Sequence, residues 1–115
     1  MELQELKTVY DSRKSFYKKA MVDKIDDTFR LFSYGTLIAT ANDTVVTLVD
    51  KKEEDYSQTT LRHLREFVVQ FAYGVSKNMN RQDVLKHLRE NKPYDFTMTK
   101  PLTEKWFNVD EHYKM

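Results

Sequence analysis

The order of hydrophobic and polar residues divides the chain into an alternating first half and a helical second half. From Phe16 to Val49, apolar and polar residues alternate with a period of two, as in strands that present one face to a core. Asp26-Asp27, Gly35 and Asn42-Asp43 interrupt the alternation with turn-forming side chains, and connections this short favour antiparallel neighbours. The pattern predicts a four-stranded antiparallel meander with strands at about 16–25, 28–34, 36–41 and 44–49.

Helical spacing of apolar residues occurs before and after this meander. Residues 2–10 carry apolar groups every three to four positions and predict a short N-terminal helix. The main helix is expected at about 58–73, where the apolar stripe is widest. A second helix is expected at about 81–91, with Asn80 as its N-cap. The C-terminal segment 93–115 is either a third helical element or an extended arm across the sheet.

Together these elements predict an α+β fold in which helices pack on one face of the sheet. The length of 115 residues fits one domain spanning 1–115, and the 13% aromatic content excludes a disordered chain. Along the second strand, Phe29, Leu31 and Ser33 share one face, and the alternate residues occupy the other. Because apolar groups occur on both faces, we expect one face to pack against the helices and the other to be partly covered.

Charge and composition narrow the possible functions. The 19 basic and 18 acidic residues nearly cancel, so binding to nucleic acid would have to depend on a local basic patch. The chain has no cysteine, which excludes thiol nucleophiles, disulfides and sulfur-rich metal sites and fits a reducing compartment. No stretch has the apolar length of a signal peptide or a membrane span, so we expect a cytoplasmic protein with no membrane partner.

The motifs of common enzymes are absent from the sequence. Phosphate loops, dinucleotide-binding fingerprints and nucleophile elbows are missing, and the three histidines lack the spacing of a metal pair. We therefore expect no enzymatic activity, no cofactor and no bound metal. A hydrolase would need His63 beside a carboxylate in a cleft, because an imidazole base needs an orienting partner.

The start of the main helix allows two interpretations. Ser57 or Thr59 can cap the free N–H groups of the first turn, which is sufficient to explain these residue types. Alternatively, the N–H groups, the hydroxyls and Arg62 could bind a phosphate or carboxylate. Capping is the simpler explanation.

Three segments resemble a known group of proteins. They are Tyr10-Asp11-Ser12-Arg13-Lys14-Ser15-Phe16-Tyr17, Ser33-Tyr34-Gly35-Thr36-Leu37-Ile38-Ala39 and Tyr56-Ser57-Gln58-Thr59-Thr60-Leu61-Arg62-His63. In this order they resemble small uncharacterised proteins carried by phages and other mobile elements of Gram-positive bacteria. The resemblance spans about residues 10–70 and implies a genomic context, which for a phage protein would be the host cytoplasm.

This context leads to two hypotheses about function. Small accessory phage proteins without catalytic motifs often bind a host protein, so we expect an inhibitor or modulator, with a CRISPR-Cas effector nuclease as the favoured target. The alternative is an accessory protein that binds nucleic acid through the basic faces of the two C-terminal helices, with Arg62, Arg65, Arg81, Lys86 and Arg89 as contacts. Aromatic and arginine side chains carry most binding energy at protein interfaces. The candidate partner-binding residues are Tyr10, Arg13, Tyr17, Arg62, Arg65, Tyr73 and Trp106.

Overall fold

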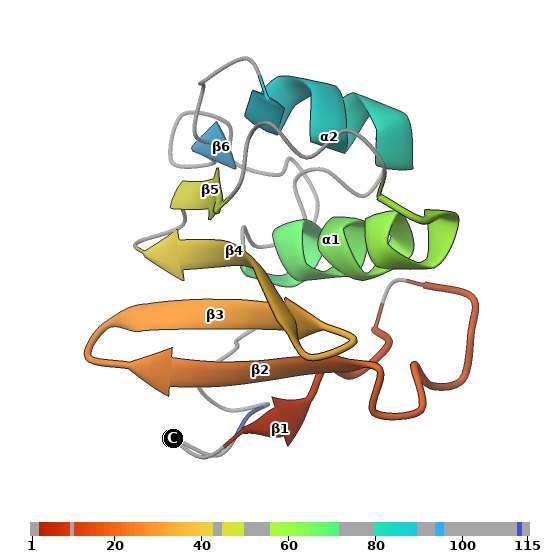
Figure 1. The fold of residues 1–115 in the computed structure, drawn as a ribbon, viewed down its shortest axis with the longest axis horizontal. Helices are drawn as coiled ribbons and strands as arrows, with labels where there is room; N and C mark the ends of the chain where they lie inside the picture. Colours follow the sequence, from red (N-terminus) through yellow and green to blue (C-terminus); the bar gives the residue numbers. More distant parts are fainter. Residues whose placement is uncertain are drawn as a thin grey trace, which may run out of the picture.

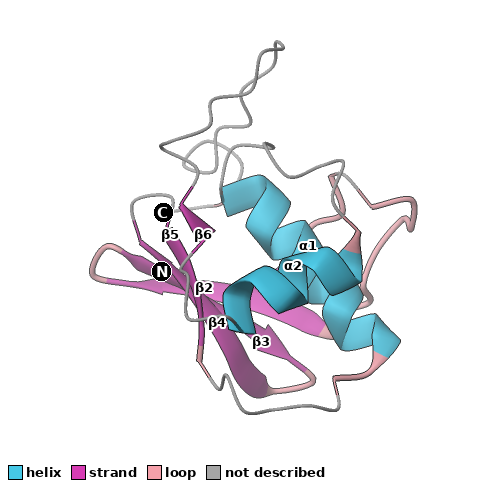
Figure 2. Cartoon of the chain, turned by 90° about the horizontal axis from the view of Figure 1, so that it is seen from above, coloured by secondary structure: helices cyan, strands magenta, loops and turns pink. Residues whose placement is uncertain are grey.

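The computed structural model describes residues 3–9, 11–42, 45–49, 56–71, 80–89, 94–95 and 113. Within these residues, six strands form one antiparallel sheet in which the strands follow their order in the chain (Figure 1). The two helices lie on the same face of the sheet (Figure 2), so the predicted α+β class is confirmed. The elements are β1 (Gln4–Glu5), β2 (Ala20–Ile25), β3 (Thr28–Ser33), β4 (Thr36–Asn42), β5 (Val45–Leu48), α1 (Gln58–Phe71), α2 (Arg81–Arg89) and β6 (Tyr94–Asp95).

The four central strands, β2 to β5, form the predicted meander. The sheet extends it at both edges with the two-residue strands β1 and β6, which the hydrophobic pattern did not predict. Strand β2 begins at Ala20 rather than at residue 16. Residues 16–19 form a turn instead, because the Lys19 N–H donates to the Phe16 carbonyl at 2.9 Å.

The predicted N-terminal helix at 2–10 is wrong over its described part. The chain runs antiparallel to β2 there, and the Leu6 N–H donates to the Ala20 carbonyl at 2.8 Å. Leu3, Leu6 and Val9 have helical spacing, but only Leu6 is buried, and the other two are 51% and 39% exposed. The spacing therefore does not mark one apolar face.

Both helices begin at side-chain caps. Of the two cap candidates for α1, the structure selects Ser57, whose Oγ accepts the Thr60 N–H at 3.0 Å. The predicted cap of α2 is confirmed, because Asn80 Oδ1 accepts the Asp83 N–H at 2.8 Å. The predicted ends of these helices near residues 73 and 91, and a third helix in 93–115, lie outside the described residues.

The core fills the space between the sheet and the helices. Phe29, Leu31 and Ser33 are buried on the face toward the helices, and the Phe29 and Phe71 rings lie 4.6 Å apart between their centroids. On the opposite face, Arg30 forms a two-point ion pair with Asp23, its directly opposite neighbour on β2. This ion pair raises the pKa of Arg30, mainly through the hydrogen bonds to Asp23.

Candidate functional site

One corner of the molecule combines exposed tyrosines with exposed cations. The loop that leads into β2 and the tight turn between β3 and β4 meet there, because the Tyr34 N–H donates to the Lys19 carbonyl at 2.8 Å. Tyr17 is 70% exposed and Tyr34 is 56% exposed. The cations of the loop are exposed as well. We call Arg13, Lys14, Tyr17, Lys18, Lys19 and Tyr34 the basic tyrosine corner.

The backbone of this corner is strained. Tyr17, Lys18 and Tyr34 have φ angles of 52°, 62° and 51°, in the left-handed region that side chains with a Cβ rarely occupy. Tyr34 and Gly35, with a φ of 80°, form a two-residue turn with the positive φ angles of a type I′ turn. Asn-Gly is the preferred sequence in such turns, so a tyrosine at the first position is unfavourable for folding.

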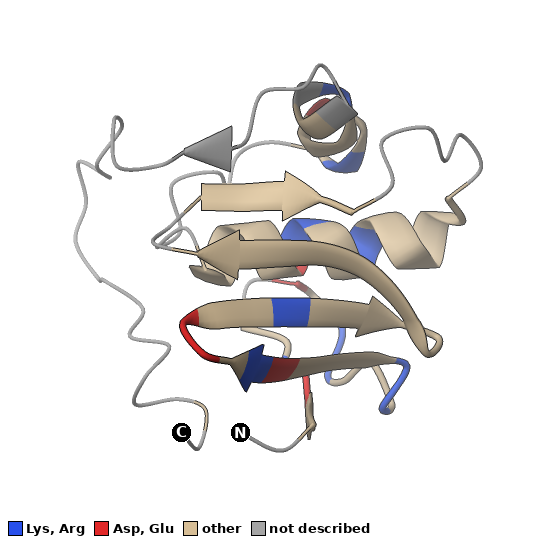
Figure 3. Cartoon of the chain, turned by 60° about the vertical axis from the view of Figure 1, so that its left-hand side comes forward, with Lys and Arg blue, Asp and Glu red and all other residues tan. Residues whose placement is uncertain are grey.

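The two ends of β2 adjoin loops of different charge. Figure 3 shows Lys and Arg positions in blue on the loop that leads into β2, whereas the turn between β2 and β3 is acidic. That acidic turn is Asp26-Asp27, at the opposite end of the strand from Lys19. The corner is therefore locally basic although the whole chain carries a net charge of only +1.

Hydrogen bonds within the loop and to the N-terminal segment hold the loop of the corner in place. The Lys18 N–H donates to Glu5 Oε2 at 2.6 Å, and the Tyr17 N–H donates to Ser15 Oγ at 2.8 Å. The Thr8 hydroxyl donates to the Lys14 carbonyl at 2.8 Å. These bonds fix the strained backbone, so the exposed tyrosine ring is presented by a defined scaffold.

His63 lies beneath this corner and is fully buried. Its Nδ1 lies 2.8 Å from Ser33 Oγ, and its ring packs against Phe16 at 4.6 Å and Tyr34 at 5.8 Å between centroids. Burial lowers the pKa of His63 to about 4, with Arg13 and Arg62 adding to the shift and Asp11 opposing it. His63 is therefore neutral near pH 7.

The geometry of His63 differs from that required of a hydrolase. Within the described part of the chain, its partner is a serine rather than a carboxylate, and its Nε2 has no hydrogen-bond partner. Ser33 is itself only 2% exposed. An orienting carboxylate for a general base is thus not found at His63 among these residues. Nor do the described residues contain a group of three potential metal ligands.

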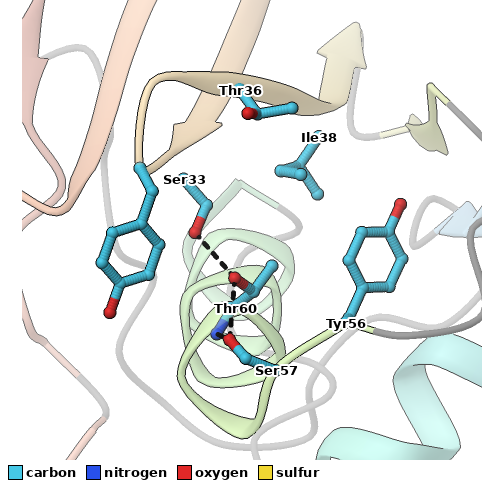
Figure 4. A pocket seen from close by; sticks show the side chains of 7 residues that line it. Ser33, Thr36, Ile38, Tyr56, Ser57 and Thr60 are labelled. Atoms are coloured by element: carbon cyan, nitrogen blue, oxygen red, sulfur yellow. Dashed lines mark hydrogen bonds between the residues drawn. The ribbon is translucent and has the colours of Figure 1, made fainter.

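A pocket of about 320 Å³ opens beside the corner, between the β3–β4 turn and the first turn of α1 (Figure 4). Ser33, Thr60 and Ser57 lie on one side of it, and Tyr56 and Ile38 lie across from them. Six of the seven lining residues carry a hydroxyl group and none carries a charge. The lining residues are Ser33, Tyr34, Thr36, Ile38, Tyr56, Ser57 and Thr60.

The polar side of α1 is covered by the N-terminal segment. Glu66 is fully buried, and its carboxylate accepts the Asp11 N–H at 2.6 Å and the Val9 N–H at 3.2 Å. Arg62, one turn earlier, lies 3.4 Å from the Asp11 carboxylate. Glu66 is therefore a buried carboxylate that binds backbone N–H groups and is not part of a solvated helix face.

Gln70 and Tyr113 continue this covered row. Gln70 is fully buried and donates to the Lys7 carbonyl and to Glu66. The Tyr113 hydroxyl donates to Gln70 Oε1 at 2.7 Å and accepts the Lys7 N–H at 3.2 Å. Burial raises the pKa of Tyr113 above its ordinary value. A residue near the C-terminus thus contacts both α1 and the N-terminal segment.

The structure separates the candidate partner-binding residues. Arg13 and Tyr17 lie together at the basic tyrosine corner and are exposed. Arg62 and Arg65 lie on α1 and are half-buried, and the ion pair of Arg62 with Asp11 occupies it away from the helix start. The other three candidates, Tyr10, Tyr73 and Trp106, lie outside the described residues.

The proposed nucleic-acid contacts on the helices show a similar division. Besides the paired Arg62, Arg81 is half-buried and its guanidinium donates to the Gln58 carbonyl at 3.3 Å. Lys86 is exposed on α2. Arg89 is the last residue of α2, and the structure does not describe its side chain. Tyr34 is not among the residues selected from the sequence, although Tyr34-Gly35 at a tight turn is the signal that could have marked it.

Fold and surface together define the class as an α+β domain with two helices on one face of an antiparallel sheet and an exposed basic tyrosine corner. A family model described as a family of unknown function (DUF8033) matches residues 4–87, and the chain belongs to this family. No curated protein and no solved structure matches the chain. Among the described residues, no helix is long and apolar enough to cross a membrane.

Proposed function

We propose that this protein is a binding module that engages an acidic surface of a partner protein through the basic tyrosine corner. The observation that carries the proposal is the positive φ of exposed Tyr17 and Tyr34. Left-handed backbone costs about 1–2 kcal/mol at a residue with a Cβ. Asn and Gly adopt this conformation more readily, so tyrosine at these positions is unfavourable for folding and consistent with a role in binding.

The chemistry of the corner supports a protein interface. Tyrosine and arginine are enriched at binding hot spots, because a rigid ring or guanidinium provides a large contact at low entropic cost. The corner exposes four cations in addition to the two rings, and complementary charge increases the rate of association. The partner would therefore present acidic groups around a site that accepts a tyrosine ring.

The favoured partner within this proposal is a host protein, and specifically a CRISPR-Cas effector nuclease. The support for this target is the resemblance of three segments to small phage proteins, which implies a phage or mobile-element context. The protein would act by covering a functional surface of the nuclease or by blocking a conformational change, in the host cytoplasm.

A quantitative pulldown tests the proposal. The tagged protein, its Tyr17→Ala variant and its Ile25→Ala variant are each incubated with a lysate of a Gram-positive host, and retained proteins are quantified by mass spectrometry. Ile25 is the matched control, because it is an exposed hydrophobic residue at the opposite end of β2, with 51% of its surface exposed.

We expect a host protein to be retained by the wild type and by Ile25→Ala and to be reduced at least tenfold with Tyr17→Ala, as for a hot-spot residue. Equal retention by all three proteins would exclude the corner as the binding surface. Inhibition of a purified effector nuclease by the wild type, and not by Tyr17→Ala, tests the favoured target.

The second candidate is a single-stranded nucleic acid bound at the same corner. Exposed tyrosines among cations can stack bases and contact phosphates. The helix cations favoured by the sequence are less suitable, since Arg62 and Arg81 bond within the chain. Affinity for a single-stranded probe should then fall steeply with salt, and each lost phosphate contact should reduce the log–log slope by about one. A mobility-shift assay without any shift at low salt excludes this candidate.

A further inference from the structure

The basic tyrosine corner is built from two tight turns of the same kind. Tyr17 and Lys18 have positive φ angles of 52° and 62°. The Lys19 N–H donates to the Phe16 carbonyl at 2.9 Å, which closes a turn with the φ angles of type I′. The turn between β3 and β4 has such angles as well. The Tyr34 N–H donates to the Lys19 carbonyl, so the two turns lie side by side.

One buried side chain supports both turns. The centroid of the His63 ring lies 4.6 Å from that of Phe16 and 5.8 Å from that of Tyr34. Its Nδ1 lies 2.8 Å from the Ser33 hydroxyl. Phe16 is the first residue of one turn, and Ser33 is the first residue of the other. Since His63 contacts both residues, the relative position of the two turns depends on its ring.

The surroundings of His63 suit a neutral ring. Either tautomer of the neutral ring can bond the Ser33 hydroxyl, because a hydroxyl both donates and accepts. The charged ring donates from both nitrogens. Its Nε2 is buried and has no hydrogen-bond partner among the described residues, so a charged ring would keep an unsatisfied N–H there. Proton binding therefore disfavours the closed arrangement of the corner.

The charged groups that face His63 do not reverse this effect. Burial is the main reason that the pKa of His63 falls to about 4, and Arg13 from the loop before β2 and Arg62 from α1 add to it. Asp11 acts in the opposite direction, but its carboxylate also lies 3.4 Å from the Arg62 guanidinium. From the turn between β3 and β4, Tyr34 faces His63 with its aromatic ring. A proton on His63 is thus better accommodated in water than in the closed corner.

The turn between β3 and β4 separates His63 from solvent. Ser33 and Tyr34 both contact the histidine, and both line the pocket of about 320 Å³ that opens beside the corner. Tyr34 is 56% exposed and has an unfavourable left-handed backbone. Exposed segments with few buried contacts are the parts of a protein that open most easily while the rest stays folded. A local movement of this turn is therefore the shortest way for His63 to reach water.

We propose that His63 makes the basic tyrosine corner sensitive to acid, because the neutral ring holds the two turns together and proton binding favours a locally open corner. This role of His63 does not depend on the proposed function. Its consequence for binding rests on that function, because a partner that recognises the closed corner binds less tightly as the open form becomes populated.

The size of the effect follows from proton linkage. His63 has its ordinary pKa of 6.5 when the corner is open and a pKa of about 4 when the corner is closed. The equilibrium constant for opening should then rise about threefold from pH 7 to pH 6 and about twentyfold from pH 7 to pH 5. Below about pH 4 the rise levels off, because both forms then bind the proton.

Amide hydrogen exchange, followed by NMR at pH 7, 6 and 5, tests the proposal on the protein alone. The reporters are the N–H groups of Lys19 and Tyr34, whose hydrogen bonds close one turn and join the two. The control is the Val84 N–H, which donates to the Asn80 carbonyl at the start of α2. Each rate is compared with that of an unstructured chain at the same pH, which gives the protection of the amide and removes the intrinsic pH dependence of exchange.

His63→Asn is the matched variant. The asparagine amide can bond the Ser33 hydroxyl and does not titrate. The variant keeps His87 and His112 as well as the Glu5 carboxylate that binds the loop, so their titration affects both proteins equally. Circular dichroism verifies that the variant is folded, and the comparison between the corner and α2 within the wild type needs no variant.

We expect the protection of Lys19 and Tyr34 in the wild type to fall about twentyfold from pH 7 to pH 5, whereas that of Val84 stays nearly constant. In His63→Asn the fall at the corner should disappear. At pH 7, both corner amides should be clearly less protected than the slowest amides of the sheet, as required for local opening.

Three results would overturn the proposal. They are corner protection that does not change with pH, an equal change at Val84, and corner amides as protected as the slowest amides of the sheet. The last result would show that His63 reaches water only when the whole protein unfolds.

The exchange measurement and the pulldown can fail independently. A partner retained through Tyr17 without any pH-dependent opening overturns the role of His63 and leaves the proposed function standing. A corner that opens with acid in a protein that retains no partner supports the role of His63 and contradicts the proposed function.

Discussion

Acidification should destabilise this protein through His63 before the buried ring itself becomes protonated. The pKa of His63 is lowered from its ordinary value of 6.5 to about 4, chiefly because burial disfavours the charged ring. Between these two values the unfolded chain binds a proton that the folded protein excludes. The free energy of unfolding must therefore decrease as the pH falls from 6.5, and the decrease levels off below about 4.

The magnitude follows from proton linkage. With pKa values of 6.5 and about 4, His63 contributes a loss of about 1 kcal/mol at pH 6, about 2 kcal/mol at pH 5 and about 3 kcal/mol at pH 4. Such a loss is a large fraction of the stability of a typical domain, which is about 5–15 kcal/mol. Titrating carboxylates also change stability in this range, so the His63 contribution requires a comparison between two proteins.

His63→Asn is the appropriate variant for that comparison. The asparagine amide can accept from or donate to the Ser33 hydroxyl in place of Nδ1, and the side chain does not titrate. Urea unfolding at pH 7, 6 and 5 gives the free energy of unfolding of both proteins. The carboxylates that both proteins share cancel when the two pH dependences are subtracted. The wild type should lose about 2 kcal/mol more than the variant between pH 7 and pH 5. If the stability of both proteins changed equally with pH, or if NMR showed that His63 titrates near pH 6.5, the claim of a buried, neutral His63 would be refuted.

Three further predictions concern stability and are each measured by urea unfolding. Glu66→Gln should lower the free energy of unfolding by about 2–4 kcal/mol, because an amide nitrogen would replace one of the oxygens that accept backbone N–H groups. A decrease below about 0.5 kcal/mol would contradict the buried position of Glu66 on α1. Phe71→Ala should lower the free energy of unfolding by roughly 3–5 kcal/mol, since the Phe71 ring packs against Phe29 in the core. A decrease as small as that of a surface substitution would show that the ring is not buried. Ser57→Ala should lose about 1 kcal/mol as an N-cap, and unchanged stability would argue against that role.

Local patterns predicted the central part of the fold. The period-two alternation located β2 to β5 within a few residues, because each strand has a buried and a more open face. The starts of both helices followed from cap chemistry at Ser57 and Asn80. These features depend on residues that are close in sequence, which is why one sequence is sufficient to find them.

Long-range polar contacts explain where prediction failed. Glu66 and Gln70 are polar residues of the kind found on a solvated helix face, yet both are buried because backbone groups of Lys7, Val9 and Asp11 bind them. No local pattern reveals a partner more than fifty residues away. The same segment was assigned to a helix because its apolar spacing did not show that Glu5 pairs with Met21 on β2.

The candidate site was predicted only in part. Arg13 and Tyr17 were selected as exposed anchors and lie together, whereas Arg62 was selected from the same chemistry and is paired with Asp11. The importance of Tyr34 depends on its backbone conformation, which composition and charge do not reveal. A tyrosine before a glycine in a two-residue hairpin is the signal by which such a site can be sought in other sequences.

The Tyr34→Asn variant tests the central claim most directly, because it separates folding from binding. Asparagine is favoured over tyrosine at the first position of this turn, so relief of the left-handed strain should leave urea stability unchanged or raise it by up to about 1 kcal/mol. In the same preparation, retention of the partner in a pulldown should fall at least tenfold, as for a hot-spot residue. A variant that is clearly less stable than the wild type but retains the partner fully would show that Tyr34 serves the fold and would contradict its role in binding.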